Sequence, residues 1–253
     1  MRILFIHTRY LQSYGGEDTT VEAETNLLRS RGHEVYVELF DNTDMGKGIK
    51  GKINAGIQSV YNLSSAKRIE RRIRDIRPDI VHVHNFFFMA SPSVLYAASR
   101  MGVPVVATIQ NFRLVCANAL LLRNNKVCEL CLPHDFPWHG VKYKCYHNSA
   151  VQSTMVGAMG AIHKWTGGWR KKVDLYITPA AFIRSKLLDS SLKPDPGKIK
   201  VKRNFIDDPG YGDPAARQSF YLFIGRLSPE KGVSTLLDAW RQMPGEQIRI
   251  VGD

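Results

Sequence analysis

A short stretch near the end of the chain carries two cations in a setting that suits phosphate binding. Residues 223–232 read FIGRLSPEKG. The apolar pattern predicts a strand over 220–225 before this turn and a helix over 233–243 after it. Such a turn offers backbone N–H groups to an anion, Arg226 can bind a phosphate with two N–H bonds, and Lys231 adds a point charge. Taken by themselves, the two cations would fit a solvated charged loop better than a phosphate site.

A second strand-to-helix turn near the start of the chain carries two glycines. Gly15 and Gly16 separate a predicted strand over 2–7 from a predicted helix over 17–30. Glycine allows a ligand to approach the backbone closely. Their spacing is not the Gly-x-Gly-x-x-Gly of dinucleotide sites, which disfavours a nicotinamide cofactor. An ordinary turn is the alternative for this pair.

These stretches together resemble one enzyme family. Residues 223–232, with RILFIH at 2–7, GGED at 15–18 and RGHEV at 31–35, look like the family-4 retaining glycosyltransferases of GT-B architecture. The resemblance implies two Rossmann-like domains around a cleft and a nucleotide diphosphate sugar as the donor. It implies that Arg226 and Lys231, with Gly225, bind the donor diphosphate and stabilise its charge during transfer, and that Gly15 and Gly16 face the phosphates.

The same resemblance implies more about the reaction. The acceptor would be a saccharide or a lipid-linked saccharide in cell-surface polysaccharide biosynthesis, and transfer would retain the anomeric configuration. No catalytic metal is required where two cations neutralise the leaving group. The family's carboxylate-rich motif lies beyond the segment matched here, so no nucleophile or base is assigned.

The pattern along the whole chain predicts an α/β fold with a parallel sheet and helices on both of its faces. The predicted strands are 2–7, 34–40, 79–84, 103–110, 174–178, 199–203, 220–225 and 247–251. The predicted helices are 17–30, 53–76, 91–100, 150–171, 182–188 and 233–243.

The domain organisation follows from one break in this pattern. The Pro-, Gly- and Asp-rich sequence at 207–214 predicts a linker over 207–218. It separates an acceptor-side Rossmann-like domain, 1–206, from the start of a nucleotide-sugar-binding domain, 219–253. The latter contains only strand, helix and strand, so we expect a truncated second domain and an inactive fragment. A non-catalytic protein of transferase descent is an alternative.

Two predicted strands end in polar residues, at the edge of the sheet where such folds bind ligands. His84 and Asn85 follow the strand over 79–84, and Gln110 and Asn111 end the strand over 103–110. We expect these four residues to contact the acceptor or the transferred sugar. A structural role is an equal alternative for His84, and Asn85 could cap the following turn. Related enzymes often carry histidine at the position of Gln110, which cannot titrate and so would only position the sugar.

Four cysteines lie in one insertion, 112–148. Cys128 and Cys131 form a C-x-x-C pair, and Cys116 and Cys145 flank it. This spacing suits a structural zinc, with free thiols or a redox pair as alternatives.

The formal net charge of +12 favours anionic partners. A nucleic-acid-binding protein is the alternative function, although the charge is spread along the chain and no nucleic-acid-binding module is recognisable. The predicted helix over 53–76, preceded by Lys47, Lys50 and Lys52, is basic and amphipathic, and a second patch from Lys164 to Lys172 is basic and aromatic. Each could rest on an anionic membrane or simply pack with a solvated charged face. The sequence has no run of about 20 apolar residues and no signal peptide, so it predicts a cytoplasmic protein. Its basic surfaces would allow it to lie at the inner face of the membrane.

Overall fold

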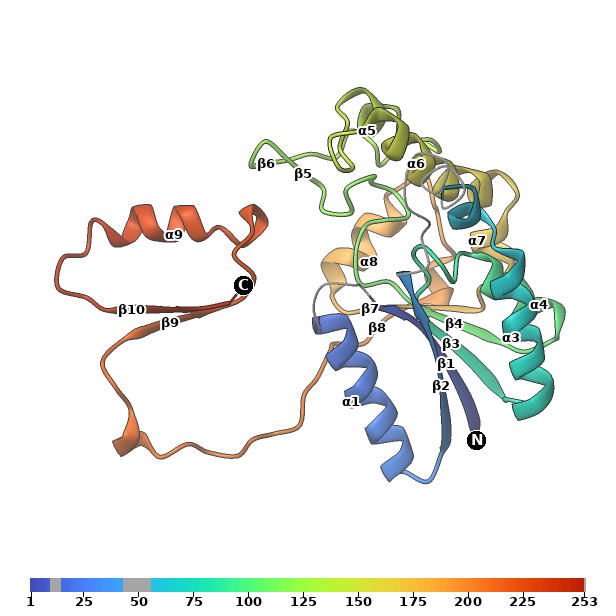
Figure 1. Ribbon diagram of the computed structural model, residues 1–253, viewed down its shortest axis with the longest axis horizontal. Coiled ribbons are helices and arrows are strands. Elements are labelled where there is room, and N and C mark those ends of the chain that lie inside the picture. Colours follow the sequence, from blue (N-terminus) through green and yellow to red (C-terminus); the bar gives the residue numbers. More distant parts are fainter. Residues whose placement is uncertain (10–14, 43–55, 253) are drawn as a thin grey trace. The chain divides into compact units, whose positions relative to one another are not determined.

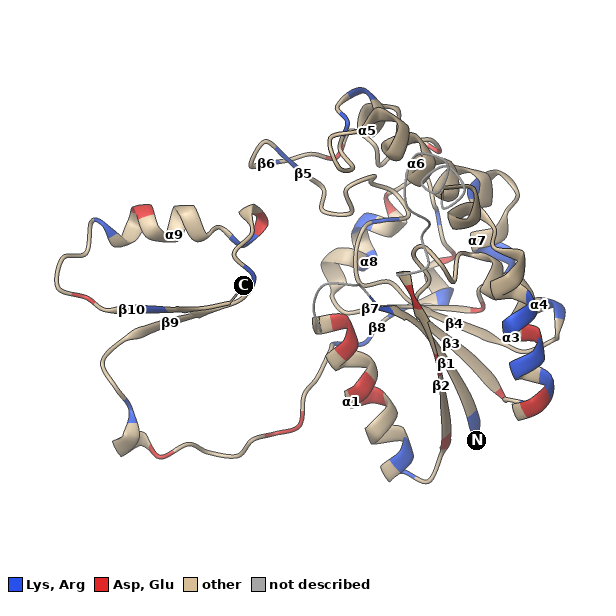
Figure 2. Cartoon of the chain, in the orientation of Figure 1, with Lys and Arg blue, Asp and Glu red and all other residues tan. Residues whose placement is uncertain are grey.

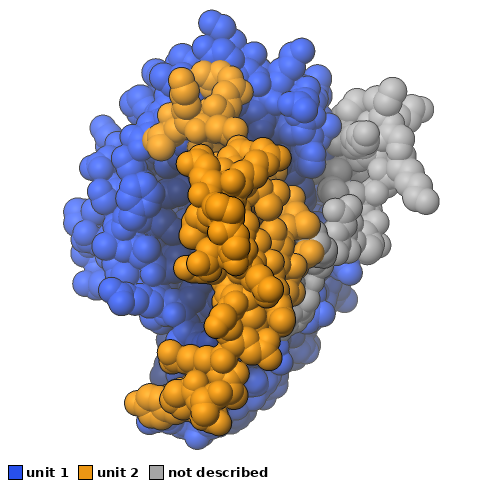
Figure 3. All heavy atoms as spheres, turned by 90° about the vertical axis from the view of Figure 1, so that its left-hand side faces the viewer, with its two compact units in different colours: residues 1–121, 128–206 blue, residues 122–127, 207–253 orange. Residues whose placement is uncertain are grey.

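The computed structural model describes residues 1–9, 15–42 and 56–252, so Lys47, Lys50, Lys52 and the predicted helix start at 53–55 lie outside the described residues. The chain forms two compact units, coloured separately in Figure 3. Unit 1 comprises residues 1–121 and 128–206, and unit 2 comprises residues 122–127 and 207–253.

Unit 1 is built on a six-stranded sheet with the order β2-β1-β3-β4-β7-β8. Every neighbouring pair is parallel, which confirms the α/β parallel-sheet prediction. The strands are β1 (Arg2–Arg9), β2 (Glu34–Asp41), β3 (Ile80–Asn85), β4 (Val105–Thr108), β7 (Leu175–Thr178) and β8 (Ile199–Val201). The predicted strand over 103–110 is shorter at both ends.

Helices cover both faces of this sheet, as Figure 1 shows. They are α1 (Gly16–Ser30), α3 (Leu63–Ile76), α4 (Ser93–Arg100), α5 (Trp138–Lys142), α6 (Ala150–Trp165), α7 (Gly168–Lys171), α8 (Ala181–Leu188) and the 3₁₀ turn η2 (Pro196–Lys198). Side chains alternate along a strand, so β1 sends Leu4 and Ile6 to the larger core and Ile3 and Phe5 to a smaller one. The larger core receives α3, α4, α6, α7 and α8, whereas α1 packs on the smaller core.

The prediction of one helix over 53–76 is wrong. Residues 56–60 are helical, but the backbone is extended at Asn62, where α3 begins. Asn62 Oδ1 accepts hydrogen bonds from the N–H groups of Ser64 (3.1 Å) and Ser65 (3.2 Å). These are N–H groups that no helical carbonyl can satisfy, so the asparagine starts a new helix.

The basic face of α3 is partly neutralised within unit 1. Ile69, Ile73 and Ile76 pack in the larger core, as an ordinary amphipathic helix would. Arg68 and Arg72 donate to the two carboxylate oxygens of Glu38 on β2, at 2.5 and 2.9 Å. Figure 2 shows how the remaining cations are spread over the chain.

The prediction of one helix over 150–171 is also wrong. Gly167 adopts a left-handed backbone (φ 69°) and separates α6 from α7. Glycine reaches this conformation without the steric cost that a β-carbon imposes. The turn lets Trp169 reach back, and its indole Nε1 donates to the Gly160 carbonyl at 3.0 Å.

Unit 2 contains the predicted strand, helix and strand. They are β9 (Tyr221–Ile224), α9 (Val233–Trp240) and β10 (Ile248–Val251), with β9 parallel to β10 and the 3₁₀ turns η3 (Pro214–Ala216) and η4 (Pro229–Lys231). A two-stranded hairpin, β5 (Leu122–Arg123) and β6 (Lys126–Val127), was not predicted. Among the described residues, none of the helices has the length and apolar character needed to cross a membrane.

We expect Asn62→Ala to lower the free energy of unfolding by about 2 kcal/mol, because two interactions are lost. These are the cap of α3 and the hydrogen bond that Asn62 Nδ2 donates to the Met89 carbonyl. Urea unfolding followed by circular dichroism measures this change. Asn62→Asp should cost less, because it keeps the capping oxygen. Lys67→Ala, on the exposed face of the same helix, is the control. Equal stability of Asn62→Ala and Lys67→Ala would contradict the capping role.

Candidate functional site

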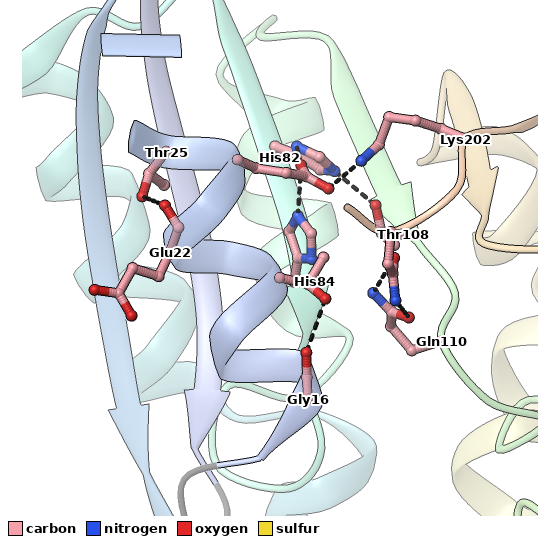
Figure 4. Close-up of polar contacts among 11 residues, drawn as sticks. Gly16, Glu22, Thr25, His82, His84, Thr108, Gln110 and Lys202 are labelled. Carbon is pink, nitrogen blue, oxygen red and sulfur yellow. Dashed lines mark hydrogen bonds and ion pairs between the residues drawn. The ribbon is translucent and has the colours of Figure 1, made fainter. Parts of the chain in front are cut away.

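Polar side chains gather between α1 and the sheet, on the face opposite the larger core. In β3, Val81 and Val83 point into the larger core. The alternation of a strand therefore sends His82 and His84 to the other face, where the His84 ring stacks on Phe5 and the His82 ring lies tilted beside it. Figure 4 shows both histidines beneath α1, with Thr108 and Lys202 beside them.

Glu24 of α1 is the centre of this group and is almost completely buried. Its Oε2 lies 3.2 Å from His84 Nε2 and 3.8 Å from His82 Nδ1. Its Oε1 forms an ion pair with the ammonium of Lys202, just after β8. His82 Nε2 in turn lies 2.8 Å from the Thr108 hydroxyl at the end of β4. The Glu24 carboxylate thus joins α1 to β3 and to the end of β8, and His82 extends the group to β4.

Burial and neighbouring charges determine which side chains of this cluster are ionised. Burial alone would raise the pKa of Glu24, but the hydrogen bonds and charges of His84 and Lys202 outweigh it and lower the pKa to about 2. Burial, helped by the charge of His84, lowers the pKa of His82 to about 3. Glu24 is therefore ionised and His82 neutral near pH 7. His82 is thus a buried, hydrogen-bonded histidine of the core.

Glu24, His82 and His84 also place three potential metal-ligand atoms within 4.8 Å of one another. A divalent ion there would have to share the carboxylate with the ammonium of Lys202. Like charges at that separation repel strongly in a buried setting. We therefore assign the group as an ion-pair cluster.

A second carboxylate, Glu17, joins two of the predicted acceptor residues at the first turn of α1. Its Oε2 accepts from Asn85 Nδ2 at 3.2 Å, and its Oε1 accepts from Asn111 Nδ2 at 3.2 Å. Burial raises the pKa of Glu17, and the two amides work in the opposite direction. Asn85 also caps the following turn, because its Oδ1 accepts from the Phe87 N–H at 3.0 Å. Asn85 therefore both caps the turn after β3 and contacts Glu17 at the carboxyl edge of the sheet.

A third carboxylate fixes the glycine turn. Asp18 Oδ2 accepts from the Gly15 N–H at 2.9 Å, and its Oδ1 lies 3.0 Å from His7 Nε2 and 3.7 Å from Arg9 Nε. Burial lowers the pKa of His7 despite the bond to Asp18. The backbone before α1 is therefore held to the end of β1.

All four predicted acceptor residues line one small cavity at this edge. His84, Asn85, Gln110 and Asn111 surround it together with Thr108 and Arg113. They differ in their partners: Asn85 and Asn111 bind Glu17, and His84 binds Glu24. Gln110 exchanges two hydrogen bonds with Asn204, at 3.2 and 3.4 Å.

The two glycines of the turn are not required by the backbone. Gly15 has φ −116°, which any residue adopts, and Gly16 is not among the positive-φ residues. A β-carbon on Gly16 would meet no atom within 4 Å, and one on Gly15 would make only ordinary contact with Asp18. Packing thus gives no reason for glycine at either position.

In unit 2, Arg226 and Lys231 lie on the turn between β9 and α9, and both are exposed. The Arg226 guanidinium is 3.5 Å from the Glu230 carboxylate, which also accepts a 2.6 Å bond from Ser228. Gly225 ends β9, and Gly232 adopts a left-handed backbone (φ 70°) at the start of α9. The structure therefore has the predicted strand, turn and helix around these two cations.

Cys116, Cys128, Cys131 and Cys145 form no disulfide bond in the described part of the chain, and Cys131 is buried. Burial raises the pKa of Cys131 to about 11, and the other three thiols act on it in the same direction. Within 1–9, 15–42 and 56–252, however, no three of their sulfur atoms come within 4.8 Å of one another. The thiols as placed do not form a tetrahedral zinc set, and the structural zinc stays a prediction.

Comparison with known proteins identifies the chain. The model of Glycosyltransferase Family 4 matches residues 14–208. The chain belongs to this family. It is 25% identical over 263 residues to an uncharacterized 42.6 kDa protein in the cps region of Klebsiella pneumoniae, covering 92% of this chain and 63% of that protein.

Solved structures share the fold at low identity. Crystal structures of Anabaena HepE resemble the chain with a TM-score of 0.56 for the complex with UDP and glucose, and 0.58 for the complex with UDP. Identity is 15% in both, over 99% and 100% of this chain and 60% and 61% of HepE. The chain thus spans about three fifths of the length of these relatives. These likenesses support the Rossmann-like fold predicted for a family of GT-B type.

The sequence analysis did not identify several polar residues that lie between α1 and the sheet: His7, Asp18, Glu24, Thr108 and Lys202. Glu17, Val21, Glu24 and Leu28 follow the spacing of one helix face. Two carboxylates on the helix face that also carries Val21 and Leu28 indicate polar partners buried beneath the helix. Lys202 carried no comparable sign.

We expect Glu24→Gln to lower the free energy of unfolding by about 3 kcal/mol at pH 7, because a carboxyl whose pKa falls from 4.5 to about 2 on folding stabilises the folded state whenever it is ionised. This contribution is complete above pH 4.5 and is lost as the pH falls towards 2. The difference from wild type should therefore shrink between pH 5 and pH 3. Urea unfolding at several pH values measures it.

Glu22→Gln is the matched control, on the exposed face two positions earlier in α1. Its stability should follow that of the wild type at each pH. A Glu24→Gln difference that stayed constant from pH 7 to pH 3 would rule out the ion-pair assignment.

Proposed function

We propose that this protein transfers a sugar from a nucleotide diphosphate sugar to a saccharide or lipid-linked acceptor, with retention of configuration. The observation that carries the proposal is the grouping of Gly15, Glu17, Asn85 and Asn111 at the carboxyl edge of the sheet. Membership of Glycosyltransferase Family 4 supports it. The UDP and glucose bound to HepE are the kind of ligand we propose for this chain.

The unit 1 edge provides groups suited to sugar hydroxyls. Asn85, Gln110 and Asn111 each carry both donors and acceptors, and Glu17 accepts. These groups are held by one another and by Asn204, so little side-chain freedom would be lost when a sugar binds. We assign this edge of the sheet to the acceptor and the transferred sugar.

The unit 2 turn provides charge for the leaving group. When the glycosidic bond to the diphosphate breaks, negative charge develops on the phosphate oxygens. Arg226 and Lys231 would stabilise that charge, and Gly225 leaves the turn accessible. The Arg226–Glu230 contact is 3.5 Å long and exposed, so it would give way to a phosphate at little cost.

The wider setting follows from the same proposal. A relative in a cps region fits a role in cell-surface polysaccharide synthesis. Exposed cations on α3, among them Arg71 and Arg74, would allow peripheral contact with an anionic membrane at its cytoplasmic side.

We expect Gly16→Ala to separate folding from function. Alanine at this helical position should leave stability unchanged or raise it by up to about 1 kcal/mol, because no neighbouring atom opposes a β-carbon. Donor binding should weaken at least tenfold if a phosphate approaches this backbone. Thermal unfolding and titration with nucleotide diphosphate sugars measure the two effects. Unchanged donor affinity would remove Gly16 from the site.

We expect one nucleotide diphosphate to raise the unfolding temperature of the complete gene product, and Arg226→Ala or Lys231→Ala to abolish most of that rise. Each charged contact to phosphate contributes roughly tenfold in affinity. Arg241→Ala, an exposed arginine at the end of α9, is the control. If no nucleotide moved the unfolding temperature of the wild type, the transferase proposal would fail.

A further inference from the structure

Unit 1 contains a second hollow that the proposed function does not use. Its volume is about 410 Å³, within the range of small-molecule sites. Four segments form its wall: 133–135 of the cysteine-bearing insertion, the end of α6, α7 with the Gly167 turn, and 191–193 after α8. It shares no residue with the cavity at the carboxyl edge of the sheet.

Lys164 holds three of these segments together. Its ammonium donates to the Asp135 carbonyl at 3.1 Å, the Ser191 hydroxyl at 2.9 Å and the His134 carbonyl at 3.5 Å. All of these acceptors are neutral, and within the described ranges the ammonium has no ion pair. Burial lowers the pKa of Lys164 to about 8, which still leaves it mostly charged at pH 7.

Two further cations lie at the rim. Arg170 and Lys193 line the same hollow, both are exposed, and neither forms an ion pair within the part of the chain that is described. Asp135 is the one acidic side chain in the lining. Three cations against one carboxylate leave a formal charge of +2, which matches the dianion of a phosphate ester at neutral pH.

The lining also offers an aromatic surface. The Trp165 side chain belongs to the wall and is 63% exposed, whereas Trp169 behind it is buried. An exposed indole face beside cations suits a ligand that has an apolar or sugar face next to its charge.

We propose that this hollow binds a phosphate ester, whose phosphate is held by Lys164, Arg170 and Lys193 and whose organic part contacts Trp165. Arginine gives two parallel N–H bonds to phosphate, and the fixed ammonium of Lys164 is already oriented by the wall. The site shares no residue with the groups assigned to the donor, which are the glycine turn before α1 and the unit 2 turn.

The test uses the complete gene product carrying Arg226→Ala and Lys231→Ala, so that the proposed donor site cannot contribute. Inorganic pyrophosphate is titrated by calorimetry into this background and into the background with Arg170→Gln and Lys193→Gln added. Both residues are exposed, so folding should be unaffected, which circular dichroism checks. Lys164 is left in place because it supports the wall.

We expect the added pair to weaken pyrophosphate binding at least tenfold. The matched control, Arg31→Gln with Lys198→Gln, changes two exposed cations outside this hollow, removes the same charge and should leave affinity within twofold. If both pairs of substitutions weakened pyrophosphate binding equally, the binding would reflect general charge attraction and the proposal would be overturned. An affinity that Arg170→Gln with Lys193→Gln left unchanged would also overturn it.

A second arm identifies the source of the phosphate. The same variants are sedimented with vesicles of phosphatidylcholine alone or with added phosphatidic acid, whose headgroup is a phosphate monoester. Binding to anionic vesicles that depends on Arg170 and Lys193 supports a lipid headgroup as the ligand. Pyrophosphate binding that depends on them, without such vesicle binding, supports a soluble phosphate ester. If the protein that carries only Arg226→Ala and Lys231→Ala binds neither probe at millimolar concentration, the proposal fails.

Discussion

A buried negative charge constrains the architecture of unit 1. Glu24 is removed from water beneath α1, and a carboxylate in such a setting is stable only if partners replace its hydration. Lys202 supplies the opposite charge, and His84 supplies a hydrogen bond. These partners come from β3 and from the end of β8. The position of α1 is therefore tied to the sheet by electrostatics as well as by the small apolar core on that face.

The consequence reaches the candidate site through α1. Glu17 lies two turns before Glu24 on the same helix face, so fixing Glu24 also fixes the carboxylate that orients Asn85 and Asn111. Asp18 adds a second anchor by binding both the Gly15 N–H and His7. These contacts hold Gly15 in place, although the backbone conformation there does not require glycine. Under the proposed function, unit 1 offers amides and carboxylates for hydroxyl groups, while unit 2 offers cations for phosphate.

Local patterns in the sequence predicted much of this arrangement. Apolar runs located the strands, and the rule that ligands meet the carboxyl ends of parallel strands pointed to Asn85 and Asn111. Long-range pairing could not be predicted in the same way. Glu24 and Lys202 are 178 residues apart, and nothing local to Lys202 distinguishes it from the other cations of a basic chain. The helix breaks at Asn62 and Gly167 depend on a cap and a turn that the apolar periodicity conceals.

The Glu24–Lys202 pair also limits how related sequences can diverge. Loss of the acid would leave an ammonium without its counter-ion, and loss of the lysine would leave a carboxylate buried against two imidazoles. Each single replacement therefore gives a destabilised protein, whereas replacing both residues by apolar residues of similar volume does not. Positions 24 and 202 are therefore expected to vary as a pair among homologues, a covariation signal that spans nearly the whole of unit 1.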